Sequence, residues 1–167
     1  MTPELVVTAF GARFGGRRFA CTIGRSGISN AKLEGDGATP AGILHVVGML
    51  FRPDRIVPHR LPHWAKPIGL RDLWSDDSAD PAYNRLARAP HHFSHENLRR
   101  PDPLYDLILI TDWNFFPATT PGNGSAIFLH RWRRPHAPTA GCIGFSAPDL
   151  LWLARHLPLG CRIRIIG

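Results

Sequence analysis

One cysteine of this chain lies in a setting that suits catalysis. Cys142 closes the small-residue run TAGC, which begins at Thr139, and it follows the strand-end residue His130 by twelve positions. A thiol that transfers acyl groups needs a base to hold the thiolate and backbone N–H groups to stabilise an oxyanion. Small residues let such N–H groups approach a ligand closely. We predict Cys142 as the nucleophile, His130 as the base, and the backbone N–H groups of Ala140, Gly141 and Cys142 as the donors.

A metal site competes with this interpretation, because sequence distance alone does not establish that sulfur and imidazole meet. Its candidate ligands are the histidines and the cysteine of two segments: His91, His92, His95, His130, His136 and Cys142. The intervals between the last three are H-x5-H and H-x5-C, which match none of the usual zinc spacings. Pro135 and Pro138 lie between them and disfavour a common ligand face. We therefore expect neither a metal nor another cofactor.

A basic, non-enzymatic nucleic-acid-binding module is the alternative of another class. The net charge of +7 and the pI of about 10.3 suit an anionic partner. Arg131, Trp132, Arg133 and Arg134 interleave an aromatic ring with arginines, but they make a short footprint and no recognised binding module accompanies them. The arginines are otherwise scattered along the sequence rather than gathered on one predicted face. We expect Trp132, Arg133 and Arg134 to face solvent or to contact a substrate carboxylate.

Length and composition predict a single domain over residues 1–167. The hydrophobic fraction is 44%, and no apolar run approaches the roughly 20 residues that span a bilayer. The N-terminal residues show no secretory-signal pattern. We therefore expect a cytoplasmic protein, or a periplasmic or cell-envelope protein if the true start lies upstream. Three widely spaced cysteines predict no disulfide framework and indicate a reducing compartment.

Alternating apolar residues, together with 16 Gly and 16 Pro, predict a mainly β fold of short strands joined by turns. The candidate strands are Leu5–Phe10, Arg17–Ile23, Ile43–Leu50, Leu107–Thr111, Ser125–His130 and Cys161–Ile166. In the strand that ends at His130, alternation places this histidine on the same face as Ala126 and Phe128. A lone histidine on such a face is more often a hydrogen-bonded core residue than a catalyst.

One helix is predicted directly after Cys142. Ser146 is a suitable N-cap, and Asp149 three residues later makes a carboxylate variant of the capping box. Apolar residues then recur at helical spacing: Leu150, Leu153, Ala154 and Leu157. Pro158 ends the run.

Residues 61–103 are predicted to be a loop-rich insertion. So long a stretch without a regular pattern is uncommon unless it binds something or forms a lid. Five of its side chains are candidates to line a cleft: Trp64, Trp74, Tyr83, Arg85 and Glu96. The alternative is that the Trp and Tyr side chains anchor the insertion to the sheet.

Four stretches carry a resemblance to a known family. They are EGDGATPAG at 34–42, WSDDSADPAYN at 74–84, GSAIFLH at 124–130 and TAGCIGF at 139–145. Together they resemble the L,D-transpeptidase family with the YkuD-type catalytic domain, and more narrowly its compact single-domain branch. The most specific feature is a strand-end histidine followed by Ser/Thr-x-Gly-Cys and a capped helix.

The resemblance implies a YkuD-like β-sandwich with one or a few short helices, acting on peptidoglycan stem peptides. In that family the cysteine attacks the carbonyl between the L-centre of a diamino acid and a terminal D-Ala, and an amine of a second stem peptide resolves the thioester. By position, Cys142 matches the nucleophile, His130 the base and Gly141 the glycine of the motif. The backbone carbonyl of Arg131 matches the group that orients the imidazole, and Thr139 matches the motif's Ser or Thr.

Two positions depart from the family's pattern. Ala140 stands where the family usually has His, and Gly144 stands where it usually has Asn or Arg. A backbone N–H at position 140 survives the substitution, so the nucleophile and base are expected to stay intact, whereas the acceptor is not predicted. Because no signal sequence is present, the alternative is a cytosolic L,D-carboxypeptidase of muropeptide recycling, in which water hydrolyses the same thioester.

Overall fold

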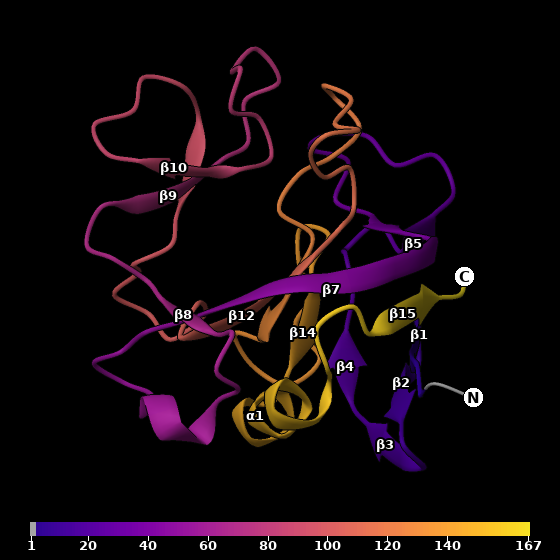
Figure 1. Cartoon of the computed structure of the whole chain (residues 1–167). Helices are drawn as coiled ribbons and strands as arrows, with labels where there is room; N and C mark the ends of the chain where they lie inside the picture. The colour runs from indigo at the N-terminus through magenta and orange to yellow at the C-terminus, as the bar shows by residue number, and fades with distance from the viewer. Residues whose placement is uncertain (1–2) are drawn as a thin grey trace.

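One large sheet organises the fold (Figure 1). The computed structural model describes residues 3–167. The sheet has ten strands, in the order β3-β2-β1-β15-β7-β12-β13-β14-β4, with β8 paired to β7. Their bounds are β1 Leu5–Thr8, β2 Gly11–Phe14, β3 Arg17–Phe19, β4 Cys21–Thr22, β7 Gly42–Phe51, β8 Lys66–Pro67, β12 Leu107–Thr111, β13 Phe128–Arg131, β14 Ile143–Phe145 and β15 Arg162–Ile165. The terminal strands β3 and β4 are separated in the chain only by Ala20, so the sheet curls into a near barrel.

The mainly β prediction is confirmed, and the corrections concern strand boundaries. The predicted strand Leu107–Thr111 is β12 without change, and Ile43–Leu50 gains one residue at each end in β7. The predicted strand Arg17–Ile23 is interrupted at Ala20, because the chain there passes from one end of the sheet to the other. Leu5–Phe10 ends early at Thr8, which pairs with Gly11 at a tight turn. Cys161–Ile166 is shorter by one residue at each end, while β2 and β14 were not predicted.

The strand predicted over Ser125–His130 instead begins at Phe128 and runs to Arg131. Ala126 has φ +51°, outside the extended region, so regular pairing starts only after it. Both faces of this segment are buried. Ala126 and Phe128 contact one hydrophobic cluster, whereas Ile127 and Leu129 contact the other, as the predicted alternation requires.

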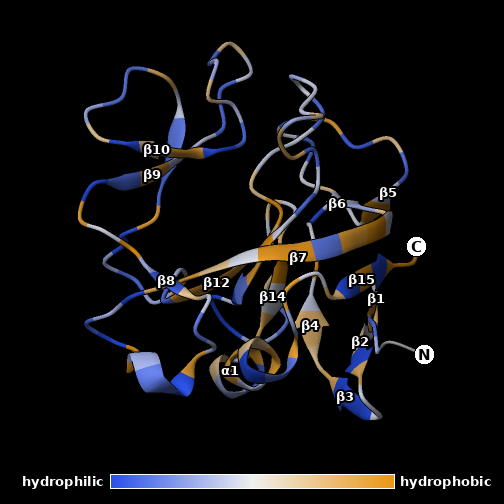
Figure 2. Ribbon diagram, viewed as in Figure 1, coloured by the Kyte–Doolittle hydropathy of each residue, from blue (hydrophilic) through white to orange (hydrophobic). Residues whose placement is uncertain are grey.

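Two hydrophobic clusters therefore lie on opposite sides of β12 and β13. The larger fills the curled sheet and includes Leu5, Leu109 and Phe145. The smaller lies beneath the 61–103 segment and includes Trp74, Leu98 and Phe128. In Figure 2 the hydrophobic colour covers much of β7 in the middle of the molecule and is interrupted by a hydrophilic stretch.

The helix α1, Ala147–His156, begins as the sequence predicts. The Ser146 hydroxyl accepts from the Asp149 N–H at 3.2 Å, and Pro148 lies in the first turn. Leu150, Leu153 and Ala154 are buried against the larger cluster. Since the helix follows β14 after a single residue, its packing also fixes the strand that follows Cys142.

The insertion at 61–103 has short strands between long loops. It contains a three-stranded sheet in the order β10-β9-β11, together with β8 and a short 3-10 helix η1 at Pro58–Arg60 just before it. The strands are β9 Asp72–Ser75, β10 Leu86–Arg88 and β11 His95–Asn97. The sequence does not predict β9 because polar residues of this strand are buried, so polar and apolar residues do not alternate with exposure. Asp72, for example, accepts a hydrogen bond from the Gly69 N–H at 2.8 Å. A separate parallel pair, β5 Ile28–Ser29 and β6 Thr39–Pro40, lies near the C-terminus of the chain (Figure 1).

Four arginines share the outer face of the large sheet, which corrects the expectation that arginines are gathered on no face. Residues that pair across neighbouring strands lie on the same face of a sheet, as do residues two apart on one strand. Arg13 pairs with Arg18 and with Val6, and Val6 also pairs with Arg164. Arg162 lies two residues before Arg164 and so shares this face. Figure 2 shows the hydrophilic colour on β3 and β15. Among residues 3–167, no helix has the length and apolar character that crossing a membrane would require.

We expect Leu153→Ala to lower the free energy of unfolding by about 2–5 kcal/mol, because Leu153 is 0% exposed in the larger cluster and truncation leaves a cavity. The matched control is Leu159→Ala, since Leu159 is 54% exposed and its loss should change stability by no more than about 0.5 kcal/mol. Urea denaturation of both variants measures the difference. Equal losses in the two variants would contradict this packing.

Candidate active site

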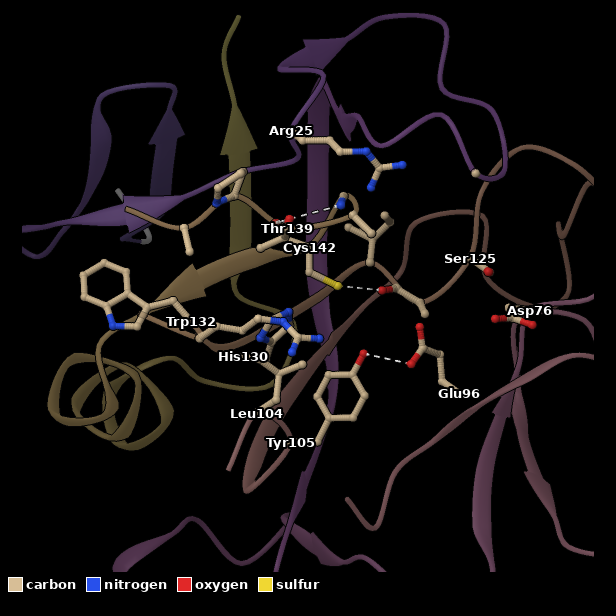
Figure 3. Close-up of a pocket in the computed structure, with 18 of the residues that line it drawn as sticks. Arg25, Asp76, Glu96, Leu104, Tyr105, Ser125, His130, Trp132, Thr139 and Cys142 are labelled. Carbon is tan, nitrogen blue, oxygen red and sulfur yellow. Dashed lines mark hydrogen bonds between the residues drawn. The ribbon is translucent and has the colours of Figure 1, made fainter. Parts of the chain in front are cut away.

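A cavity of about 400 Å³ opens where β13 and β14 lie beside the insertion (Figure 3). Its wall includes His130, the segment from Thr139 to Cys142, and residues from the loop that follows β4. The sequence-predicted nucleophile and base thus line one cavity, although twelve residues separate them.

Strand pairing places the Cys142 thiol. β13 and β14 are parallel, with Leu129 opposite Ile143, so Cys142 lies beside the residues that precede Leu129. Its Sγ donates to the Ala126 carbonyl at 2.9 Å and accepts from the Phe128 N–H at 3.4 Å. Ala126, whose carbonyl meets the sulfur, has a positive φ of +51°.

Burial controls the protonation of this thiol. The low-polarity surroundings raise the pKa of Cys142 to about 12, the Phe128 N–H opposes that rise, and the carboxylate of Glu96 adds to it. At neutral pH the sulfur is therefore a thiol that donates a hydrogen bond, not a free thiolate.

His130 is buried at the end of β13, and its orientation is fixed on one side. Its Nδ1 lies 2.7 Å from the Arg131 carbonyl oxygen, which can only accept, so Nδ1 carries the proton and Nε2 keeps a lone pair. The ring of Tyr105 contacts it edge-on, with centroids 5.4 Å apart. Burial lowers the pKa of His130 to about 4, although the Arg131 carbonyl opposes this shift. The Arg131 carbonyl thus lies at the place that the resemblance implies for the group that orients the imidazole.

The resting pair is neutral on both sides. The thiol bonds to Ala126 rather than to the imidazole, and no hydrogen bond joins Cys142 Sγ to His130 within residues 3–167. A raised thiol pKa and a lowered imidazole pKa both oppose an ion pair before substrate enters. Nε2 is nevertheless in the protonation state that a general base requires.

Two threonines hold the turn before Cys142. Thr139 Oγ1 donates to the Cys142 carbonyl at 2.6 Å and accepts from the Gly141 N–H at 3.0 Å. Thr39 Oγ1 donates to the Gly141 carbonyl at 2.7 Å, and sequence reasoning gave this threonine no role. The N–H of Gly141 is thus engaged, whereas those of Ala140 and Cys142 make no hydrogen bond within the described chain. Of the three predicted oxyanion donors, these two stay available.

Only a glycine fits at position 141. Its φ is +147°, and a Cβ there would lie 2.9 Å from the carbonyl oxygen of Ala38. Gly144 is constrained in a different way, because a Cβ would lie 2.5 Å from Thr22 Oγ1. Thr22 of the neighbouring strand β4 therefore leaves no room for a side chain at position 144 unless its hydroxyl moves.

The basic segment after His130 reaches the cavity only in part. Trp132 and Arg133 line it, whereas the exposed Arg134 does not. The structure adds three cations that the sequence did not single out: Arg25, Lys32 and Arg100.

The candidate metal ligands do not converge. His136 is exposed beside Trp132, and His91 bonds to Asp80 at 2.7 Å inside the insertion. Over residues 3–167, no three His, Cys, Asp or Glu side chains gather in a metal-ligating arrangement.

The insertion contributes acidic side chains to the cavity. Glu96, predicted to line a cleft, does so, and Asp76 joins it. The other candidates from the insertion do not line the cavity: Trp64, Trp74, Tyr83 and Arg85. Trp74 packs in the smaller cluster, and the Tyr83 hydroxyl donates to Glu34. Trp64 packs against the larger cluster, so the two tryptophans and Tyr83 anchor the insertion.

Comparison with known families and structures gives the following relatives. Residues 11–165 match the YkuD family model, described as the L,D-transpeptidase catalytic domain. Among solved structures, the chain is similar to an L,D-transpeptidase from Mycobacterium smegmatis, at 13% sequence identity and a TM-score of 0.46. That similarity covers 99% of this chain and 59% of the other, so this chain spans less than two thirds of that protein. No curated protein matches the chain.

We expect iodoacetamide to modify Cys142 slowly at pH 7 and about tenfold faster for each pH unit up to about pH 10, because the thiolate fraction grows below a raised pKa. Mass spectrometry of the Cys142 peptide in a Cys21→Ala, Cys161→Ala background measures the rate. A rate that is already at its plateau near pH 7 would mean that the resting sulfur is a thiolate.

Proposed function

Because this chain belongs to the L,D-transpeptidase family with the YkuD catalytic domain, we propose that it cleaves an L,D peptide bond in peptidoglycan stem peptides through a thioester on Cys142. The observation that carries the proposal is that Cys142 and His130 line one cavity, with Nδ1 of the histidine held by the Arg131 carbonyl. This arrangement leaves the lone pair of Nε2 free to accept a proton, as a general base must.

The first half-reaction uses the pair as acid and base. His130 Nε2 takes the proton from Cys142 Sγ as the sulfur leaves the Ala126 carbonyl and attacks the substrate carbonyl carbon. The N–H groups of Ala140 and Cys142 supply donors for the oxyanion. When the C–N bond breaks, the imidazolium returns the proton to the departing amine of D-Ala, which leaves a neutral His130 and a thioester.

The second half-reaction has two candidate acceptors. An amine of another stem peptide would give a cross-link, whereas water would release a tripeptide as an L,D-carboxypeptidase does. In either case His130 removes the acceptor's proton and returns it to the sulfur. A cytoplasmic location would favour water, since only soluble muropeptides are met there, whereas a periplasmic or cell-envelope location would allow cross-linking.

We expect Cys142→Ala and His130→Ala each to lower D-Ala release by about 10³-fold or more, because both halves of the proton transfer are lost. Cys21→Ala is the matched control, since Cys21 lies in β4 and does not line the cavity. The assay incubates the protein with a tetrapeptide muropeptide, with and without an amine acceptor, and reads the products by mass spectrometry. Full turnover by Cys142→Ala would refute the mechanism, and the product masses separate transfer from hydrolysis.

Nucleic-acid binding is a second candidate, which the arginines on the outer face of the sheet favour. The affinity of a protein for the phosphate backbone of a nucleic acid falls steeply as the salt concentration rises. Titration with duplex and single-stranded nucleic acid at two salt concentrations separates the two functions, because the enzyme proposal requires no nanomolar, salt-sensitive affinity.

A further inference from the structure

One buried hydroxyl holds the peptide unit that joins Gly141 to Cys142. Thr39 Oγ1 donates to the Gly141 carbonyl oxygen at 2.7 Å, and it accepts from the Gly24 N–H at 2.8 Å. Because a hydroxyl has a single proton and Gly24 occupies one lone pair, that proton is committed to Gly141. Thr39 is 0% exposed and does not line the cavity. It therefore holds the turn from behind.

This bond also sets the direction of the Cys142 N–H. A trans peptide unit is planar, and its C=O and N–H groups point in opposite directions. The Gly141 carbonyl and the Cys142 N–H belong to one such unit, which is trans. With the carbonyl turned to Thr39, the N–H points away from Thr39. Cys142 lines the cavity (Figure 3), and its N–H makes no hydrogen bond within residues 3–167, so this donor is free to meet a ligand.

The glycine at position 141 makes an external restraint necessary. Glycine has more backbone freedom than any other residue. A side chain cannot stiffen the chain here, because a Cβ would lie 2.9 Å from the Ala38 carbonyl oxygen. Thr139 Oγ1 accepts from the Gly141 N–H at 3.0 Å and so restrains the peptide unit before the glycine. The unit after the glycine is restrained by Thr39.

Thr39 is itself rigidly placed. It lies in β6 opposite Ile28 of β5, and its N–H donates to the Gly27 carbonyl at 2.9 Å. The β-branched side chain restricts χ1, and the following Pro40 disfavours the helical region for Thr39. The hydroxyl is thus oriented before any substrate arrives, as electrostatic stabilisation of a transition state requires.

We infer that Thr39 is a positioning residue for acyl transfer, because its hydroxyl holds the Gly141 carbonyl so that the Cys142 N–H points at the developing oxyanion. This inference rests on the proposed function. As the S–C bond forms, the π electrons of the substrate carbonyl move to its oxygen, and the proton of the sulfur passes to His130. The negative charge on that oxygen then meets an N–H whose direction Thr39 has already set.

The test compares two reactions of the same sulfur, of which only one forms an oxyanion. Acylation by a tetrapeptide muropeptide passes through a tetrahedral oxyanion, whereas iodoacetamide alkylates sulfur by direct displacement of iodide. Removing an oxyanion donor outright costs about 10²- to 10³-fold, so misdirecting one in Thr39→Val should lower the maximal acylation rate by about 10- to 100-fold. The half-saturating peptide concentration and the rate of alkylation should not change.

Both rates are measured by mass spectrometry of the Cys142 peptide in the Cys21→Ala, Cys161→Ala background, with acylation followed in single turnovers. Thr39→Ser should restore the acylation rate, because serine keeps the hydroxyl. Thr22→Val is the matched control, since Thr22 is also buried but its Oγ1 makes no hydrogen bond in the described chain. It should leave both rates unchanged.

Thr39→Ala replaces Thr39→Val if thermal unfolding shows that the valine variant does not fold. It removes the hydroxyl without setting a methyl group against the Gly24 N–H, and the same change in the two rates is expected.

Three outcomes would overturn the inference. They are acylation at the wild-type rate without the hydroxyl, equal slowing of acylation and alkylation, and a Thr39→Ser protein as slow as Thr39→Val. The second outcome would mean that Thr39 only maintains the shape of the turn. A wild-type protein that reacts with iodoacetamide but forms no peptide adduct on Cys142 would instead refute the proposed function, and the inference with it.

Discussion

The site depends on the parallel pairing of β13 with β14. This register sets Leu129 beside Ile143, and it brings the thiol of Cys142 to the carbonyl of Ala126. Side chains alternate along a strand, so a slip of one residue would turn His130 or Cys142 to the opposite face. The helix α1 and the larger cluster hold the register, because β14 leads into the helix after a single residue.

Burial fixes the side chains of His130 and Cys142, and it also limits the reactivity of the resting thiol. The environment that fixes the imidazole and the sulfur also raises the pKa of Cys142 and lowers that of His130. In the proposed mechanism, attack by the sulfur requires proton transfer at the moment when substrate fills the cavity. A neutral resting thiol is a weak nucleophile toward other electrophiles, which restricts reaction to a molecule that the cavity has already positioned.

The insertion is part of both the core and the cavity. Its aromatic and apolar side chains build the smaller cluster against Phe128, and the same small sheet carries Glu96 into the cavity. Tyr105 joins the two roles, because it packs in that cluster, contacts the ring of His130 and donates to Glu96. The stability of the segment and the electrostatics of the cavity are therefore coupled.

The β character, the capped helix and the candidacy of Cys142 and His130 could be predicted from the sequence, because alternation, capping chemistry and a small-residue turn are local properties. The strands β9 and β14 were not predicted, since short strands that are buried on both faces or rich in polar residues show no alternation. Other features could be seen only in the folded protein: Thr39 holds Gly141, Ala126 leaves the strand to meet the thiol, and Glu96 of the insertion lines the cavity. These features join segments far apart in the chain, and no local pattern encodes their meeting.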